Sequence, residues 1–155
     1  MLLVGLSVAG CRQAEGPIPT PVDEQPNKIY DIGRDLQNIA RGEAQASQDL
    51  LDDLNGLDGT PRPAPLVREL STATAEAVAG ASLADAQAQE VARLLFIALT
   101  AEELNAQQIE QVAGDLRAAL AGSGADEAQA ARVATAATTL QDAITLNRKR
   151  WYHLF

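Results

Sequence analysis

Leu94-Leu95-Phe96-Ile97-Ala98-Leu99 is the most apolar run that follows the first eleven residues, and it ends a segment of helical periodicity from Leu83 to Leu99. A helix that is apolar on all sides is surrounded by other helices, because none of its faces suits contact with water. Six residues are too few to cross a bilayer, which takes ~20 apolar residues in a helix. The run therefore predicts a helical domain built around this segment.

Two helices are expected after this segment. Thr100-Ala-Glu-Glu103 matches the capping box, so a helix is expected from Ala101, and Gly122-Ser123-Gly124 ends it. Ser123, with Asp126 three residues later, is expected to cap the last helix. The residues expected to face the core are Ile109, Val112, Leu116 and Leu120 in the first of these helices, and Val133, Ala137, Leu140, Ile144 and Trp151 in the second.

Apolar residues also recur at helical spacing from Lys28 to about Asn55, which predicts one long helix of roughly 42 Å, with Asn27 as its N-cap. A loop with three prolines and two glycines follows, from Gly56 to Pro65. The core face of this helix and its extension is expected to contain Ile29, Ile32, Leu36, Ile39, Ala46, Leu50, Leu51, Leu54 and Leu57.

A further helix is predicted from about Pro65 to Ala79, before Gly80-Ala81-Ser82 interrupts the pattern. Ser82, with Asp85 three residues later, is a candidate N-cap for the segment from Leu83. The sequence leaves open whether the chain bends or reverses at this point. The residues expected to be buried are Leu66, Leu70, Ala73, Ala77 and Val78.

The expected fold is all-α, a small bundle of four or five helices over residues 28–155. Hydrophobic residues make up 46% of the chain, with Ala the commonest, and aromatic residues only 3%. This composition favours closely packed helices over a β-sandwich. Glycines inside predicted helices cost ~1 kcal/mol each relative to Ala, so they indicate close approach between helices or a ligand cleft. They are Gly33, Gly42, Gly80 and Gly114.

The charge of the chain argues against nucleic acid as a partner. Its net charge is -9, whereas binding to phosphates needs clustered Lys and Arg. Catalytic motifs are also absent, and the only histidine, His153, lies at the end of the chain. The acidic pairs Asp52-Asp53 and Glu102-Glu103 can be interpreted as carboxylate dyads or as solvated helix faces, and the second is favoured. No enzyme activity, metal or cofactor is expected.

The start of the chain differs from the rest. Residues 12–27 contain four of the seven prolines and have no helical period, so residues 11–27 are expected to be a semi-rigid linker, with a reach on the order of 50 Å at ~3.1 Å per residue. Residues 1–11 form an uncharged apolar run that ends at the only cysteine, Cys11. A run of this length is typical of the apolar region of an export signal, so residues 1–10 are expected to be a signal peptide.

Val8-Ala9-Gly10-Cys11 resembles the lipobox of bacterial lipoproteins, in which an aliphatic residue and two small residues precede a cysteine. The resemblance implies that the Cys11 thiol is alkylated with diacylglycerol before cleavage exposes its amine. Two or three acyl chains anchor a protein durably. No Lys or Arg precedes Cys11, which departs from the basic start of a signal peptide and suggests a start upstream of Met1. A frayed N-terminus with a buried free cysteine is the alternative.

The end of the chain, Arg148 to Phe155, holds three of the twelve basic residues and three of the five aromatic residues. Cations in the last turn of a helix complement its dipole, and Trp151 continues the core seam, so this segment can be the end of a packed helix. It can equally be an interaction tail for an acidic partner or anionic headgroups. The candidate interaction residues are Arg148, Lys149, Arg150, Trp151, Tyr152 and Phe155.

Together these features predict a bacterial envelope lipoprotein that acts as a non-catalytic structural or adaptor subunit. It would be tethered to the bilayer through acylated Cys11 and would bind an envelope protein. Arg12 follows the cysteine where Asp would retain an enterobacterial lipoprotein at the inner membrane, so the outer membrane is favoured. The alternative is a periplasmic chaperone or carrier of apolar ligands. Some secretin pilotins are similar in size and architecture, as small helical lipoproteins.

Overall fold

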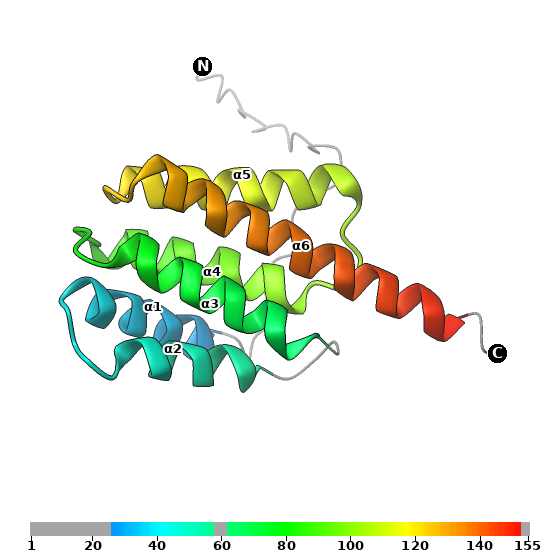
Figure 1. Ribbon diagram of the computed structural model, residues 1–155, viewed down its shortest axis with the longest axis horizontal. Coiled ribbons are helices and arrows are strands. Elements are labelled where there is room, and N and C mark those ends of the chain that lie inside the picture. The colour runs from blue at the N-terminus through cyan, green and yellow to red at the C-terminus, as the bar shows by residue number, and fades with distance from the viewer. Residues whose placement is uncertain (1–25, 58–61, 153–155) are drawn as a thin grey trace, which may run out of the picture.

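The computed structural model describes residues 26–57 and 62–152, which contain six helices and no strand. The all-α prediction is confirmed, but the number of helices is six instead of four or five. The predicted signal peptide and Cys11 lie outside the described residues, as does the predicted linker except for its last two residues, which begin the first helix. The helices are α1 (Pro26–Ala40), α2 (Ala46–Asn55), α3 (Ala64–Val78), α4 (Asp85–Thr100), α5 (Ala106–Gly122) and α6 (Glu127–Tyr152) (Figure 1).

The apolar run at the end of α4 is fully enclosed. None of the six residues from Leu94 to Leu99 is more than 4% exposed. Helix α4 packs against α1, α5 and α6, and one continuous hydrophobic core joins residues of all six helices. Gly33 of α1 allows close approach on one side, since a Cβ there would clash with the side chain of Gln89 in α4, whose Cδ atom would lie only 3.1 Å away. The prediction of a helix surrounded by others is therefore confirmed.

The long helix predicted for residues 28–55 is wrong, because the chain turns at Gly42 and forms α1 and α2 instead. Gly42 has φ 81°, a left-handed conformation that favours glycine. Its N–H donates to the Ile39 carbonyl (2.9 Å) and the Glu43 N–H to the Asn38 carbonyl (3.0 Å), the two bonds of a Schellman motif. The apolar spacing persists across the break because both helices bury their stripe in the same core.

The close approach between helices that was predicted at Gly42, Gly80 and Gly114 is wrong, since a Cβ added at any of them would meet nothing within 4 Å. Gly80 has φ 73° and lies in the turn after α3, where the chain reverses direction into α4 (Figure 1). Ser82 is not the N-cap of the next helix, because α4 begins only at Asp85. There the Gln87 side chain accepts a hydrogen bond from the Ala84 N–H (3.0 Å).

The predicted capping box at Thr100 is also wrong. Thr100 is the last residue of α4, and its hydroxyl donates to the Phe96 carbonyl (2.7 Å). The reciprocal cap lies five residues later, where the Asn105 side chain accepts from the Gln108 N–H and the Gln108 side chain accepts from the Asn105 N–H, both at 2.9 Å. Glu102-Glu103 therefore lies in the connection between α4 and α5, not in the first turn of a helix.

The cap of α6 is Asp126, not Ser123. One Asp126 carboxylate oxygen accepts hydrogen bonds from the N–H groups of Ala128 (2.9 Å) and Gln129 (3.3 Å). Ser123 instead donates its hydroxyl to the Leu120 carbonyl (2.7 Å) at the end of α5. The predicted core seam of α6 is confirmed as far as it is described, since the buried residues include Val133, Ala137, Leu140 and Ile144.

Candidate functional site

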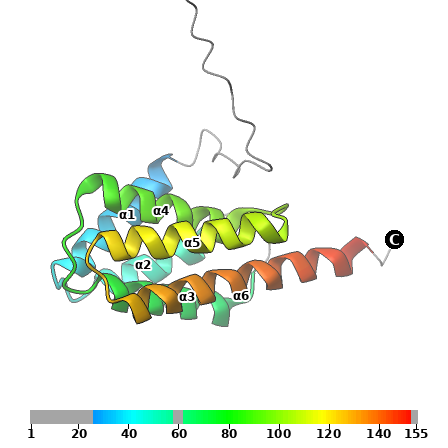
Figure 2. The same cartoon turned by 90° about the horizontal axis from the view of Figure 1, so that it is seen from above.

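Helix α6 extends beyond the other five helices at its C-terminal end, as two perpendicular views show (Figures 1 and 2). Ile144 is its last buried residue in the part of the chain whose side chains are described. The backbone nevertheless remains helical to Tyr152. We call residues 145–152 the α6 end. It is a helical segment held in place by the buried part of the same helix.

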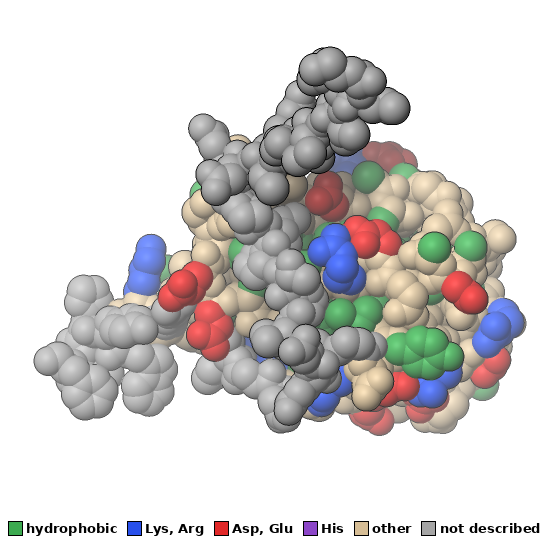
Figure 3. Space-filling model, turned by 180° about the vertical axis from the view of Figure 1, so that it is seen from behind, with side chains coloured by type: hydrophobic (Ala, Val, Ile, Leu, Met, Phe, Trp, Pro, Cys, Tyr) green, Lys and Arg blue, Asp and Glu red, His purple; other side chains and the backbone are tan. Residues whose placement is uncertain are grey.

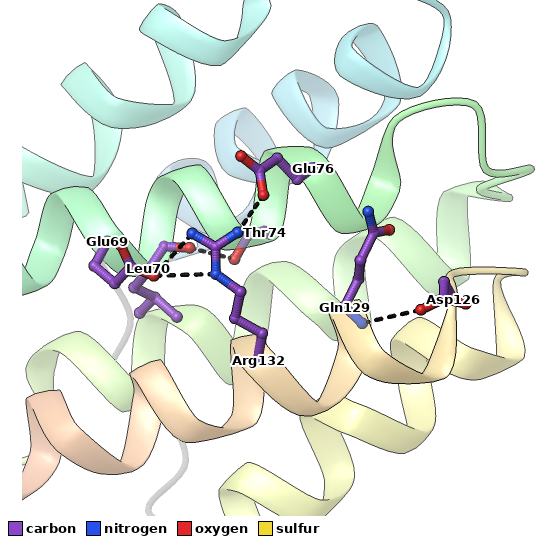
Figure 4. A network of polar contacts seen from close by, with 7 residues as sticks. All are labelled: Glu69, Leu70, Thr74, Glu76, Asp126, Gln129 and Arg132. Atoms are coloured by element: carbon purple, nitrogen blue, oxygen red, sulfur yellow. Dashed lines mark hydrogen bonds and ion pairs between the residues drawn. The ribbon is translucent and has the colours of Figure 1, made fainter.

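Arg132 fixes α6 against α3 from the solvent side. Its guanidinium donates to Glu69 at 2.9 and 3.2 Å and also to Glu76, two residues that lie seven apart on α3 (Figure 4). The hydrogen bond to Glu69 is the main cause that raises the pKa of Arg132 above its usual value. Exposed ion pairs contribute little to stability. The two contacts on one face of α3 instead restrict how α6 can slide along or rotate against it.

Gln141 fixes α6 from the inside. Its side chain is buried, and its Nε2 donates to the carbonyls of Ile97 (3.2 Å) and Ala98 in the last turn of α4. The Ile97 carbonyl also accepts from the Ala101 N–H (3.0 Å), so Gln141 is a second donor to it. Carbonyls in a last helical turn have few partners within their own helix, and a donor from outside, as at Ala98, helps to satisfy them. This contact lies one turn before the α6 end and sets the direction in which it projects.

The α6 end combines one exposed apolar side chain with two cations. Leu146 is 60% exposed, and Tyr30 of α1 is the other large hydrophobic residue that is strongly exposed in the described part of the chain. Lys149 and Arg150 are also exposed. Leu146 lies three positions before Lys149 and four positions before Arg150, so the cations share its face of the helix. An apolar contact flanked by cations suits a surface with negative charge.

The predicted interaction residues are only partly described. Lys149 and Arg150 are exposed, as an interaction tail requires. Arg148, Trp151 and Tyr152 belong to the helical backbone of α6, but their side chains lie outside the described structure, and Phe155 lies outside it entirely. Cys11, the predicted lipidation site, also lies outside the described residues.

Sequence reasoning missed a buried carboxyl pair at the contact between α1 and α2. Asp35 of α1 is only 2% exposed, and Asp53 of α2 lies within hydrogen-bonding reach of it. Burial is the main cause that raises the pKa of Asp35 to about 7, with further contributions from Asp53 and Asp49, while Arg34 acts in the opposite direction. The interpretation of Asp52-Asp53 as a solvated face therefore needs correction for Asp53, which is half-buried. The register of α1 already placed Asp35 on the core face, between Ile32 and Ile39.

An open groove of about 820 Å³ lies between α2, α3 and the turn that joins α1 to α2. Its lining mixes the apolar side chains of Ile39 and Leu51 with the charged side chains of Glu43, Arg68 and Glu76. Binding sites for small apolar ligands are mostly apolar and enclose most of the ligand. This groove therefore has the wrong lining for an apolar cargo.

The face opposite to that of Figure 1 shows no single dominant charge outside its grey part (Figure 3). Acidic and basic side chains alternate there, and hydrophobic side chains form small separate groups. Across the residues described, no group of three or more His, Cys, Asp or Glu side chains could hold a metal ion.

None of the helices described here has the length and apolar character needed to span a bilayer. Comparison of the chain with known protein families, with curated proteins and with solved structures gives no match.

Proposed function

We propose that the chain is a bacterial envelope lipoprotein with a non-catalytic adaptor role. In this proposal acylated Cys11 tethers a small helical bundle to a membrane, with the outer membrane favoured by Arg12, and residues 11–27 hold the bundle away from the bilayer. The α6 end then binds an acidic surface of an envelope protein. The lipobox-like Val8-Ala9-Gly10-Cys11 supports the tether.

The observation that carries the adaptor role is the exposure of Leu146, Lys149 and Arg150 on a helix that projects from the body of the protein. The net charge of the whole chain is -9, yet this segment presents cations. Aromatic and basic residues are enriched where proteins bind one another, and the sequence places Trp151 and Tyr152 in the same two turns. Charge complementarity therefore points to an acidic partner.

The alternative role as a carrier has less support. A carrier of apolar ligands needs an apolar cavity or groove, whereas the groove between α2 and α3 is open and lined by Glu43, Arg68 and Glu76 as well as apolar residues. The long apolar run of α4 is packed within the core and is not available to a client. The adaptor role is therefore the one that we propose.

We expect the double variant Lys149→Gln, Arg150→Gln to lose recovery of the partner after crosslinking and pull-down from envelope membranes. Both side chains are exposed, so its free energy of unfolding should stay within ~0.5 kcal/mol of the original value. Recovery by the unchanged protein should weaken with added salt, because exposed charges are screened beyond ~8–10 Å.

The matched control is Arg41→Gln, Arg117→Gln, which makes the same change in net charge at two exposed positions, one in the turn after α1 and one on α5. It should recover the partner as the unchanged protein does. Equal recovery by both double variants would contradict the proposed site. Binding of the α6 end to anionic vesicles, with no protein recovered, would contradict the protein partner.

Lipidation at Cys11 is tested separately by mass spectrometry of protein expressed from the full gene in bacteria. We expect an acylated N-terminal cysteine and no residues before it, because the lipobox cysteine becomes the first residue after cleavage. The variant Cys11→Ala should keep the leader and lose the acyl chains. An unmodified thiol with the leader retained would contradict both the tether and the proposed localisation.

A further inference from the structure

The contact between α1 and α2 contains a polar group that its surroundings do not satisfy. Asp35 is buried, and its Oδ2 atom has no hydrogen-bond partner. A buried carboxylate without partners is costly, whereas a protonated carboxyl needs only one acceptor for its proton. Asp53 supplies a carboxylate oxygen within reach. The geometry therefore suits one proton shared between two carboxyl groups.

The charged groups that act on Asp35 come from α1 and α2. Asp53 and Asp49 face it from α2, and both disfavour a negative charge on it. Arg34, its neighbour on α1, acts in the opposite direction but also pairs with Asp31 (3.3 Å) on the same helix. Helices α3 and α4 also pack against α1, and no charged side chain described on them appears among these influences.

We propose that the Asp35–Asp53 carboxyl pair is a proton-dependent latch between α1 and α2. With one shared proton, the two side chains hydrogen-bond and hold the helices together. After loss of that proton, two carboxylates face each other at a buried contact, and the α1–α2 hairpin loosens. This inference does not depend on the α6 end or on the partner proposed for it.

The latch lies where loosening can stay local. Helix α2 packs on α1 and α3, whereas α5 and α6 pack on each other and on α4, and α6 also packs on α3. A further hydrogen bond between α1 and the end of α2 is exposed, with Lys28 Nζ donating to the Gly56 carbonyl at 2.9 Å. Opening of the hairpin would therefore expose Asp35 to water while the α5–α6 pair remains packed.

The sign of the pH dependence follows from the raised pKa of Asp35. Its stabilising effect is complete below the pKa of a free Asp, ~3.9, and is lost as the pH rises to about 7. The equilibrium for opening should increase by up to ~10-fold per pH unit in this range, or about 100-fold between pH 5 and pH 7, and then level off. Protonation should therefore close the latch.

Hydrogen exchange measured by mass spectrometry on the full chain tests this proposal. Asp35→Asn mimics the neutral carboxyl, and its amide can donate to Asp53 at any pH. At pH 8 we expect peptides from α1 and α2 to exchange at least ~10-fold faster in the unchanged protein than in this variant. At pH 5 the difference should be much smaller. Comparison at equal pH removes the effect of pH on chemical exchange.

Two further variants complete the test. Asp53→Asn should also protect α1 and α2 at pH 8, but less than Asp35→Asn does, since its amide can donate to the Asp35 carboxylate but leaves that charge buried. Asp142→Asn makes the same change in charge at an exposed position on α6 and should behave as the unchanged protein. Equal exchange of α1 and α2 in all four proteins at pH 8 would overturn the latch. So would protection by Asp142→Asn, or an equal gain of protection in α5.

Discussion

Replacing Leu95 with Ala is expected to lower the free energy of unfolding by ~3–5 kcal/mol, as large-to-small changes in a close-packed core do. Leu95 is completely buried in α4, which packs against α1, α5 and α6. The change removes apolar contacts and leaves a cavity that three neighbouring helices restrict from collapsing. Urea denaturation followed by circular dichroism measures the loss. Domains are typically stable by only ~5–15 kcal/mol, so this variant should be close to unfolding at 37 °C.

Leu146→Ala is the matched control, because it makes the same chemical change at a side chain that is 60% exposed. Its free energy of unfolding should change by less than ~0.5 kcal/mol. A similar loss in both variants would mean that the α6 end is packed in solution. A loss below ~1 kcal/mol at Leu95 would contradict the central position of α4, because it is smaller than any expected for a well-packed Leu→Ala site.

The helical class and most of the core could be predicted from periodicity alone. Apolar residues recur every three or four positions, which is typical of helices with one buried face. The run from Leu94 to Leu99 is apolar on every side, which indicates a helix enclosed by others. The break at Gly42 could not be predicted in this way, because α1 and α2 bury their stripes in the same core and the spacing continues across the turn. The left-handed conformation of Gly42 depends on backbone bonds to Ile39 and Asn38 that apolar spacing does not report.

Helix boundaries were harder to predict where two capping patterns compete. Thr100-Ala-Glu-Glu103 fits the capping box better by residue type, yet Asn105 and Gln108 form the cap in the structure. Packing decides between them, since α4 continues to Thr100 and keeps Leu99 buried. A local pattern cannot report this, because the burial of Leu99 depends on residues far away in the sequence.

The candidate sites, too, could be predicted in part from the sequence, while the rest depends on tertiary contacts. The position of Asp35 could be predicted from its register on the core face of α1, but its partner Asp53 depends on how α1 and α2 fold onto each other. The basic composition of the α6 end is visible in the sequence. The projection of the α6 end beyond the other helices is not visible in the sequence. The apolar residues of α6 keep their helical spacing whether or not neighbouring helices extend as far. Where the core stops is a tertiary property.

Gln141→Glu is expected to lower the free energy of unfolding by ~3–5 kcal/mol at pH 8, the usual loss when a buried charge has no partner. The Gln141 side chain donates to the carbonyls of Ile97 and Ala98 in a buried contact between α6 and α4. A carboxylate of the same shape cannot donate, and it brings negative charge toward two carbonyl oxygens. The volume of the side chain is almost unchanged, so the loss reports polarity and not packing.

The pH dependence of this variant distinguishes buried charge from a general defect. Burial should raise the pKa of the new Glu above its usual ~4.3, and the protonated acid can again donate a hydrogen bond to a carbonyl. The variant should therefore approach the unchanged protein as the pH falls toward 4 and lose stability, by up to ~1.4 kcal/mol per pH unit, as the pH rises through the raised pKa. Because the two proteins are compared at each pH, the contribution of Asp35 cancels.

Gln129→Glu, at an exposed position on the same helix, should stay within ~0.5 kcal/mol of the unchanged protein at every pH. A deficit at position 141 that stays constant from pH 4 to pH 8 would contradict the buried contact between α6 and α4.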